Sequence, residues 1–155
     1  HGNVNMTAVS DLPMEQAVTR LVALFEHLTV ADLPEMGHYY ATHAHFKDPF
    51  NDVQGLAAIQ GIFGHMFESL HAPRFVVTNR VVQGPHCFLT WDFLFRFKSF
   101  QQDTLQTVRG ASHLVLDEQG LVTLHRDYWD AAEEMYEKFP VVGGVMRWLK
   151  KRANS

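Results

Sequence analysis

The residues best suited to chemistry gather in segment 121–134, where a predicted strand runs directly into a predicted helix. Side chains of a strand alternate between its two faces, so Thr123, His125, Asp127 and Trp129 are expected to share one face. The opposite face is expected to carry the residues between them, Val122, Leu124, Arg126 and Tyr128. Aspartate is disfavoured inside strands and is costly to bury without a partner. Asp127 is therefore interpreted either as a pocket carboxylate or as half of a structural pair with Arg126 or a histidine.

A second carboxylate, Asp92, lies in the middle of the long strand predicted for residues 86–100. One face of this strand is an unbroken aromatic series and the other is mixed, with Thr90 beside Asp92. Because both carboxylates lie among small or polar residues, where a purely structural core would have aliphatics, we expect Asp92 and Asp127 to open into one cavity. Two close carboxylates repel each other, so one of them is expected to keep a proton near neutrality and to act as an acid.

Histidine is frequent, with ten residues in the chain. His113 falls on a predicted long strand and is a third candidate for acid/base chemistry, because imidazole titrates near neutrality. His43 and His45 share one face of a short strand, but no HxxxH or HExxH spacing places two ligands on one helix face. No metal site and no other cofactor is predicted.

The composition bounds the class of protein. A chain of 155 residues, 46% of them hydrophobic, fits one domain with a buried core. We assign residues 6–155 to that domain and interpret residues 1–5 as an expression remnant. The net charge of −4 gives no basic field, so nucleic acid is not an expected partner, and no apolar run approaches the ~18 residues of a membrane span. The single cysteine, Cys87, fits a reducing compartment and predicts a cytoplasmic protein with a buried, inert thiol.

The first half of the chain is predicted to be mainly helical. A capping signal at residues 10–11 indicates a helix of about sixteen residues, and Asp32 is expected to cap a shorter second helix. A brief alternation over residues 43–47 predicts a short strand that ends at Asp48, which precedes a proline. After Gly55, apolar residues recur every three or four positions and indicate a third helix.

The second half changes to a period of two and predicts four long strands, at residues 75–83, 86–100, 105–116 and 121–129. Their connections are short, so neighbouring strands are expected to be antiparallel. Asp130 and Glu133 form a capping box for a terminal helix through Phe139, and a last amphipathic segment follows Gly143. This order predicts an α+β fold with helices on one face of a curved antiparallel sheet.

Residues 45–50, Gly55, Ile59, the four long strands and residues 125–130, in this order, resemble the nuclear transport factor two-like superfamily, in particular its SnoaL-like and ketosteroid isomerase-like members. The resemblance implies a cone-shaped fold, in which a strongly curved antiparallel sheet wraps around N-terminal helices, with a pocket between them. It also implies a homodimer through the sheet, which the two unlike faces of the 86–100 strand favour independently. The scaffold hosts several enzyme classes and non-enzymes, so the fold does not fix the function.

The ketosteroid isomerase-like pattern of this superfamily is matched only in part. Asp48 occupies the position of its proton-abstracting aspartate. The positions of its two oxyanion donors hold Leu24 and Ser112, neither of which reproduces the donor. Loss of both donors removes the electrostatic stabilisation on which the isomerisation depends, so a steroid isomerase is not expected.

Two further patterns of the superfamily use other residues. The limonene epoxide hydrolase-like pattern is matched by Asp92 and Asp127, but Thr90 stands in place of its arginine and cannot organise two carboxylates as a guanidinium does. The polyketide cyclase-like pattern needs only a pocket acid/base above a large apolar substrate, and Asp127, Asp92 or His113 would serve. This last pattern is the least contradicted by the sequence.

The sequence thus predicts a cone with an apolar pocket for a small apolar or polycyclic compound. The candidate catalytic residues are Asp127, Asp92, Asp48 and His113. The candidate ligand contacts are Thr90, His125, Tyr128, Trp129, Phe63 and Tyr40. The expected chemistry is general acid/base catalysis of an isomerase, cyclase or hydrolase type without a cofactor. The alternative is a ligand-binding or dimerisation module without catalysis.

Overall fold

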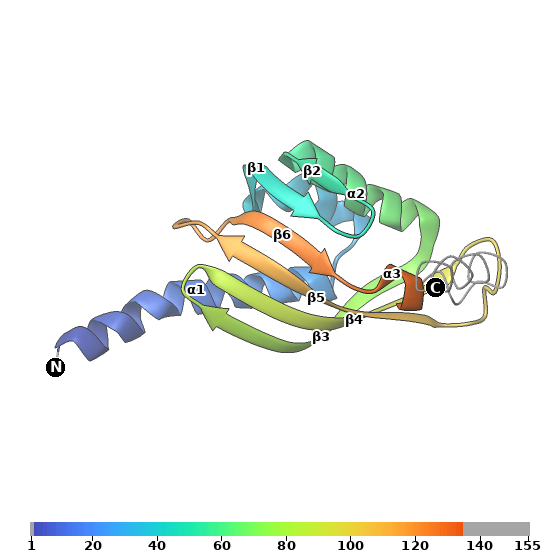
Figure 1. Ribbon diagram of the computed structural model, residues 1–155. Helices are drawn as coiled ribbons and strands as arrows, with labels where there is room; N and C mark the ends of the chain where they lie inside the picture. The colour runs from blue at the N-terminus through green and yellow to red at the C-terminus, as the bar shows by residue number, and fades with distance from the viewer. Residues whose placement is uncertain (1, 135–155) are drawn as a thin grey trace, which may run out of the picture.

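The computed structural model describes the backbone of residues 2–134 and the side chains of residues 13–134. Its helices are α1 (Gly2–Glu26), the 3-10 helix η1 (Val30–His38), α2 (Leu56–Ser69) and α3 (Ala131–Glu134). Its strands are β1 (Tyr40–Lys47), β2 (Asp52–Gln54), β3 (Leu70–Gln83), β4 (His86–Phe97), β5 (Gln106–Leu116) and β6 (Val122–Tyr128) (Figure 1). The predicted continuation of the last helix to Phe139 and the segment after Gly143 lie outside the described residues. None of the described helices is long and apolar enough to cross a membrane.

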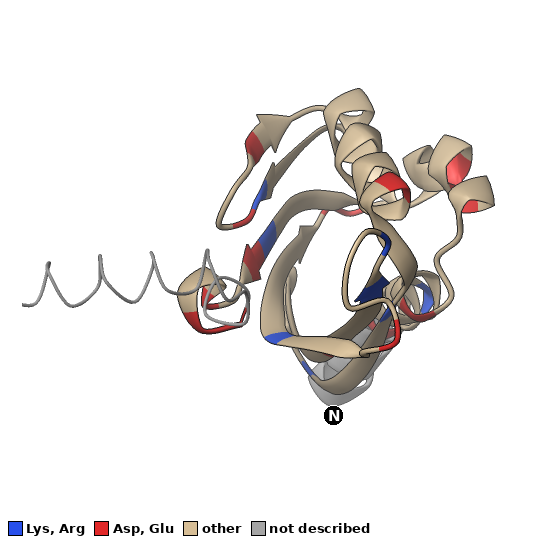
Figure 2. Ribbon diagram, turned by 90° about the vertical axis from the view of Figure 1, so that its right-hand side faces the viewer, with Lys and Arg blue, Asp and Glu red and all other residues tan. Residues whose placement is uncertain are grey.

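The strands form one six-stranded sheet in the order β2-β1-β6-β5-β4-β3. Neighbouring strands are antiparallel as predicted, except that β1 runs parallel to β6. The four long strands predicted to be antiparallel are so, whereas β1 can run parallel to β6 because no hairpin joins them and most of the domain lies between them in the chain. The sheet is curved, with α2 beside its concave side (Figure 2), and the predicted α+β fold is confirmed.

The two faces of the sheet are unlike, as the alternation along β4 predicts. Cys87, Leu89, Trp91 and Phe95 are buried in one core with apolar side chains of α1 and α2, whereas Phe88 on the other face is 47% exposed. The aromatic face of β4 therefore packs against the helices, and its mixed face points away from them. We call these the inner face and the outer face of the sheet.

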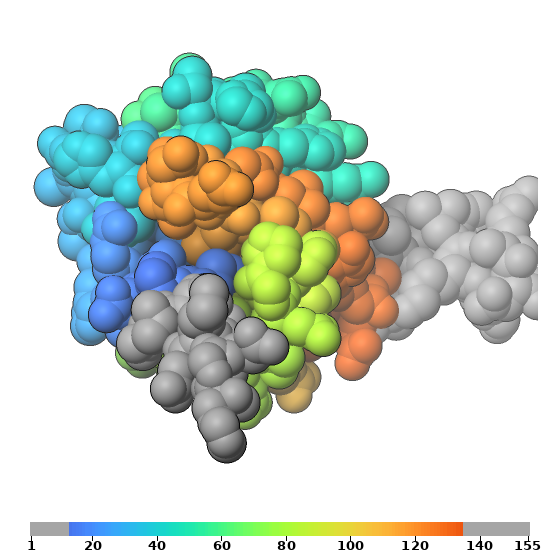
Figure 3. Space-filling view, turned by 90° about the vertical axis from the view of Figure 1, so that its left-hand side faces the viewer, coloured from blue at the N-terminus to red at the C-terminus, as the bar shows by residue number. Residues whose placement is uncertain are grey.

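The two ends of the sheet also differ. At one end the β3–β4 and β5–β6 turns lie side by side (Figure 3), and the Leu116 N–H donates to the Pro85 carbonyl at 3.0 Å. Gly120 of the β5–β6 turn has a φ of 78° and approaches Ala17 of α1 so closely that an added Cβ would lie 3.2 Å from the alanine Cβ. The turns thus close this end against α1. At the other end, β1 turns into β2 and β6 runs into α3.

Two helix starts differ from the prediction. α1 begins at Gly2 and continues through Ser10 and Pro13, so neither residue marks its start. A proline inside a helix removes a hydrogen bond but does not end the helix when the residues before it are also helical. η1 is capped by Thr29, whose N–H donates to the Asp32 carboxylate at 2.7 Å, so Asp32 is the third residue of the helix and not its cap.

Strand β6 departs from strict alternation at Thr123. Val122 and Leu124 pair with adjacent residues of β5, so Thr123 is an extra residue that shifts the register. Val122 is consequently buried in the core, and its predicted place on the outer face is wrong. His125 and Asp127, which follow the bulge, lie on the inner face with their partners on β5.

Candidate functional site

Asp127 lies on the inner face near the end of β6, and two neighbours hold one of its carboxylate oxygens. It is the direct cross-strand partner of Ser112 on β5, whose hydroxyl donates to Asp127 Oδ1 at 2.5 Å. The Nε2 atom of His125 lies 2.7 Å from the same oxygen. The side chains of His125 and Asp127 are only 5% and 14% exposed, so these bonds are shielded from water. The pairing of Asp127 with a histidine, one of the two predicted alternatives, is confirmed.

The orientation of His125 is set from behind by Tyr40. The Tyr40 hydroxyl is buried and lies 2.6 Å from His125 Nδ1. Burial and the nearby charge of Asp127 raise the pKa of Tyr40 well above its usual value, so the phenol keeps its proton. When the phenol donates its proton to Nδ1, the imidazole is left with an Nε2–H that donates to Asp127.

Trp91 on β4 is the last member of this hydrogen-bonded group. Its indole N–H donates to the Ser112 Oγ at 2.8 Å, which directs the serine proton toward Asp127. The indole reaches Ser112 by lying across Gly110, its cross-strand partner. A Cβ at Gly110 would lie 2.5 Å from the ring, so only glycine leaves room for this placement. Residues from four strands thus converge on one oxygen of Asp127.

The second carboxylate oxygen of Asp127 remains available. Oδ2 accepts no hydrogen bond from residues 13–134, yet no fully buried side-chain oxygen or nitrogen in this part of the chain lacks a partner. Oδ2 therefore has access to open space, and Asp127 lines a cavity of about 260 Å³. A second void of about 20 Å³, enough for one water, borders Asp127, Ser112 and His125.

The 260 Å³ cavity is mainly apolar and is bounded by both the sheet and α2. Its apolar wall includes Phe46, Phe50, Phe63, Met66, Phe75, Trp91, Phe93, Val108 and Trp129. Its polar groups are Asp48, Asn51, His65, Ser69 and Asp127. The volume equals about nine waters of bulk liquid, which suits a compound of one or two rings. An apolar cavity with few polar groups is the usual form of a small-molecule site.

Several predicted site residues meet at this cavity. Asp127, Asp48, Trp129 and Phe63 line it, and His125 supports Asp127 from one side. The carboxylate of Asp48, however, accepts the backbone N–H groups of the two residues after the proline, at 2.8 and 2.7 Å, and so shapes the β1–β2 turn. Tyr40 is not a ligand contact, because its hydroxyl is used by His125 and its side chain is buried behind that ring.

Four other predicted residues lie on the outer face, and their assignment to the cavity is wrong. Asp92 pairs with Arg109, an odd number of residues from Ser112, so it points away from Asp127. Thr90 bonds Thr78 on the same outer side at 2.6 Å. His113 is stacked on Phe88, and Tyr128 is 48% exposed. The close pair of carboxylates needed for the expected proton sharing and for the epoxide hydrolase-like pattern is therefore absent.

Two contributors to the site escaped the sequence reasoning. The sequence alone indicates only that Ser112 stands where an oxyanion donor is expected, and that Trp91 belongs to an aromatic face. Their roles depend on the register between β4 and β5, which alternation along a single strand does not reveal. The glycine opposite Trp91 in a strand was the one available signal, because glycine inside a strand often marks a close approach.

No group of three or more potential metal ligands occurs among the described residues. The side chains at the cavity therefore suggest recognition by shape, hydrogen bonds and one carboxylate. A buried carboxylate with one fixed and one accessible oxygen can accept a proton from a bound compound and return it.

Comparisons with known proteins agree on the fold. The family model of the SnoaL-like domain matches residues 21–125. No curated protein sequence gives a significant match. Among solved structures, a protein of ketosteroid isomerase-like fold from Catenulispora acidiphila, in complex with trimethylamine, is similar with a TM-score of 0.65 at 16% identity, over 77% of this chain and 88% of that chain.

Two further structures have the same degree of similarity. A protein from Jannaschia, provisionally named a SnoaL-like polyketide cyclase, gives a TM-score of 0.65 at 17% identity, over 78% of this chain and 90% of that chain. TerC, co-crystallised with polyporic acid, gives a TM-score of 0.64 at 16% identity, over 78% of this chain and 94% of that chain. At these identities the likeness concerns the fold alone.

Proposed function

This chain belongs to the SnoaL-like domain family, and from that premise we propose that it binds a small apolar compound in the 260 Å³ cavity and transfers a proton with Asp127 as general acid/base. The observation that carries the proposal is the asymmetry of the Asp127 carboxylate. Oδ1 is fixed by His125 and Ser112, while Oδ2 accepts no hydrogen bond from residues 13–134 and belongs to a side chain that lines the apolar cavity. Structures of similar fold were crystallised with small molecules, trimethylamine and polyporic acid, which supports the class of ligand.

The geometry supports proton transfer at an acidic carbon. A carbon–hydrogen bond next to a carbonyl is acidic enough for a carboxylate to act as its base when water is excluded and the enolate oxygen meets donors, a role that His65 and Ser69 of the cavity wall would take. Asp127 Oδ2 would take the proton, and the two donors on Oδ1 would keep the carboxylate in one orientation. Return of the proton to another atom of the same compound would give an isomerisation, and attack of the carbanion on a second carbonyl would give a ring closure.

Hydrogen exchange of a simple ketone tests this proposal without knowledge of the natural substrate. The probe is 2-tetralone, a two-ring ketone with acidic protons beside its carbonyl, dissolved in D2O with catalytic amounts of protein. Proton NMR measures loss of the carbon-bound signal. We expect the wild type to accelerate exchange over buffer and Asp127→Asn to slow the protein-catalysed rate by about 100-fold or more.

The matched control is Asp92→Asn, which makes the same chemical change on the outer face of the sheet. Its exchange rate should equal that of the wild type. Equal rates for Asp127→Asn and the wild type would overturn the assignment of the base. A wild type that binds 2-tetralone by calorimetry without accelerating exchange would favour the alternative function, a non-catalytic ligand-binding module.

We also propose that the protein forms a homodimer through the outer face. This face exposes Val81 and Phe88, which are direct cross-strand partners, with exposed fractions of 63% and 47%, and clustered apolar exposure is typical of interaction surfaces. Light scattering at micromolar concentration should give the mass of a dimer. Phe88→Glu should give a monomer, whereas Val30→Glu, at a more exposed apolar position on η1, should not. A monomeric wild type would contradict the proposal.

A further inference from the structure

A second hollow lies next to the cavity, on the outer side of the sheet. It is a crevice of about 550 Å³ at the ends of β1 and β6, with Lys47, Arg126 and Tyr128 in its wall. Asp127 and Trp129 line both this crevice and the 260 Å³ cavity. The parallel β1–β6 pairing ends at Lys47 and Arg126, so the crevice begins where the two strands separate, next to residues that also line the cavity. A compound that passes between these shared residues would occupy both hollows.

The crevice contains two cations that are neighbours in register. Lys47 and Arg126 are direct partners across β1 and β6, and like charges in register repel each other. Within residues 13–134 neither forms an ion pair. The Arg126 guanidinium lies 4.6 Å above the Tyr128 ring centre, which holds its plane without neutralising its charge. Two neighbouring cations without a direct ion pair form a suitable site for an anion between them.

The influence of this charge extends to β2. Asp52 is the cross-strand partner of Lys47, and its carboxylate is hydrogen-bonded to His45 at 2.5 Å. The pKa of Asp52 is lowered first by this hydrogen bond and then by the charges of His45, Lys47 and Arg126. The charges of the two cations thus lower the pKa of a carboxylate on the neighbouring strand.

The acids of the crevice do not cancel these cations by direct contact, because local donors engage them. Asp48 accepts backbone N–H groups of its own turn, and Asp130 Oδ1 caps α3 through a backbone N–H at 3.1 Å. Asp127 directs its bonded oxygen into the inner network. An anion placed on Lys47 and Arg126 would instead gain two charge-assisted hydrogen bonds.

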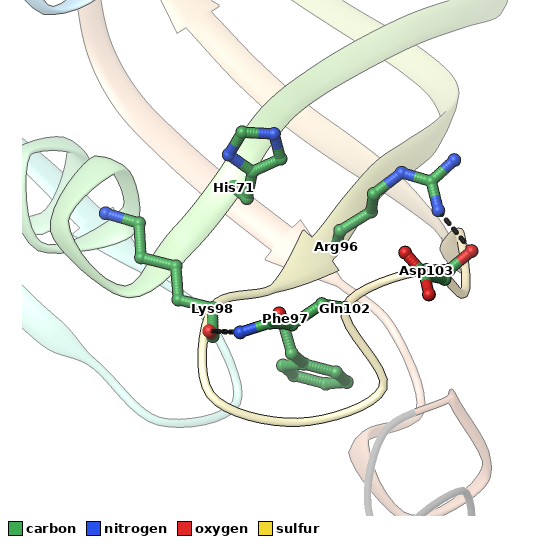
Figure 4. Close-up of a pocket in the computed structure, with 6 residues that line it drawn as sticks. All are labelled: His71, Arg96, Phe97, Lys98, Gln102 and Asp103. Carbon is green, nitrogen blue, oxygen red and sulfur yellow. Dashed lines mark hydrogen bonds between the residues drawn. The ribbon is translucent and has the colours of Figure 1, made fainter.

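Another basic hollow on the protein provides a contrast. A groove of about 650 Å³ at the end of β4 is lined by His71, Arg96, Phe97, Lys98, Gln102 and Asp103 (Figure 4). Arg96 donates to the Asp103 carbonyl at 2.5 Å, and Lys98 donates to two carbonyls at the end of α2 at 3.2 and 2.8 Å. Its cations hold the chain together, and it shares no wall residue with the 260 Å³ cavity.

We propose that Lys47 and Arg126 bind a carboxylate, or an equivalent single anionic group, of the compound whose apolar part lies in the 260 Å³ cavity. The ligand class is therefore a small apolar acid. This inference rests on the proposed function and specifies its substrate class. Binding of the anionic group outside the sheet keeps it on the two cations and orients the apolar part toward Asp127. It also offsets the repulsion that the Asp127 carboxylate exerts on an anion.

Isothermal titration calorimetry with two probes of equal shape tests the proposal. The probes are 2-naphthoate, which carries a carboxylate, and 2-naphthamide, which is neutral. The wild type should bind 2-naphthoate about 100-fold more tightly, because each of the two charge-assisted hydrogen bonds contributes about tenfold. Lys47→Gln and Arg126→Gln should each weaken 2-naphthoate binding by about tenfold and leave 2-naphthamide unchanged. The control is Arg96→Gln, which removes a cation from the groove of Figure 4 and should change neither affinity.

Equal affinities of the wild type for both probes would overturn the inference, and so would a loss of equal size for both probes in the Lys47 and Arg126 variants. If 2-naphthamide binds and 2-naphthoate gains nothing, the cavity proposal stands and the anion subsite fails. If neither probe binds, both proposals fail. Unchanged thermal unfolding of the variants identifies a loss of affinity as local.

Discussion

The inner and outer faces of the sheet carry similar side chains and use them differently. The inner face has Asp127, His125, Ser112 and Trp91, and the outer face has Asp92, His113, Thr90 and Tyr128. On the inner face the polar groups bond one another in a continuous series that ends at a cavity. On the outer face the bonds are separate, such as His86 to His113 at 2.9 Å and Thr78 to Thr90 at 2.6 Å.

The comparison shows that a step of one residue along a strand decides which face of the sheet a side chain enters. Trp91 and Asp92 are adjacent in the chain, as are Ser112 and His113, yet one member of each pair enters the inner network and the other faces away. Low polarity strengthens the hydrogen bonds of the inner group and makes any broken one costly. The same chemical types on the outer face share their interactions with water. The contrast predicts unequal responses to matched substitutions.

The largest difference is expected in thiol reactivity. Cys87 is fully buried on the inner side of β4, as the sequence predicts, and burial raises its pKa to about 11. In the Phe88→Glu background, which is expected to be monomeric, a cysteine introduced by Thr90→Cys would face water on the outer side of the same strand. At an ordinary thiol pKa of about 8.5, its thiolate population near neutrality is roughly 300-fold larger.

Labelling of the native protein with a chromogenic disulfide reagent measures this difference. The wild type should react slowly, and the Phe88→Glu variant carrying Thr90→Cys should show one fast thiol. Both proteins should label fully in denaturant, which controls for reagent quality. Fast labelling of native Cys87 would mean that the inner side of β4 is open to solvent, contrary to the structure.

A smaller difference is expected in the cost of removing one hydroxyl. Ser112→Ala takes a donor from Asp127 and an acceptor from the Trp91 indole. It should lower the free energy of unfolding by about 1–3 kcal/mol, because buried groups lose their partners. Thr90→Val removes an exposed hydroxyl from the outer face and should cost about 0.5 kcal/mol or less. Urea unfolding curves with equal slopes would measure both values, and equal costs would contradict the comparison.

The smallest effect concerns the pH dependence of stability through His113. Burial lowers the pKa of His113, and the charges of His86 and Arg126 lower it further. Between this lowered pKa and the unfolded value of about 6.5, the unfolded chain binds more protons, so stability rises with pH. The stability that neutral His113 maintains should be present above pH ~6.5 and should decrease as the pH falls below it.

Solvent screening keeps the size of this effect small, because His113 lies on the outer face. Unfolding free energies measured between pH 5 and 7.5 should therefore show a weaker slope in His113→Gln than in the wild type. An unchanged slope would assign the pH dependence to other groups and remove His113 from the account.

Most of the fold follows from periodicity in the sequence. The alternation over β4 correctly separates an aromatic inner face from a mixed outer face, and turn residues mark the hairpins. The parallel pairing of β1 with β6 does not follow, because strands far apart in the chain give no local signal of direction. The bulge at Thr123 is equally hidden, since the segment reads as an ordinary alternating strand.

The sequence predicts the candidate site only where the residues concerned follow one another along a single strand. Asp127 near the end of β6 and Trp129 just beyond that strand both line the 260 Å³ cavity, as their spacing of two residues suggests. The prediction that Asp92 lies with them is wrong. Whether Asp92 and Asp127 share a face depends on the register of β4, β5 and β6 together. The contribution of Ser112 was missed for the same reason.

The most direct test of the account observes the two carboxylates while a ligand binds. Carbon-detected NMR of protein labelled at the aspartate carboxyl carbons would follow Asp127 and Asp92 during titration with 2-tetralone, with the Asn variants of each supplying the assignments. The account predicts that the Asp127 resonance shifts with saturating behaviour and that the Asp92 resonance, on the opposite face of the sheet, stays in place. Equal movement of both resonances, or movement of Asp92 alone, would contradict the claim that the inner face holds the site.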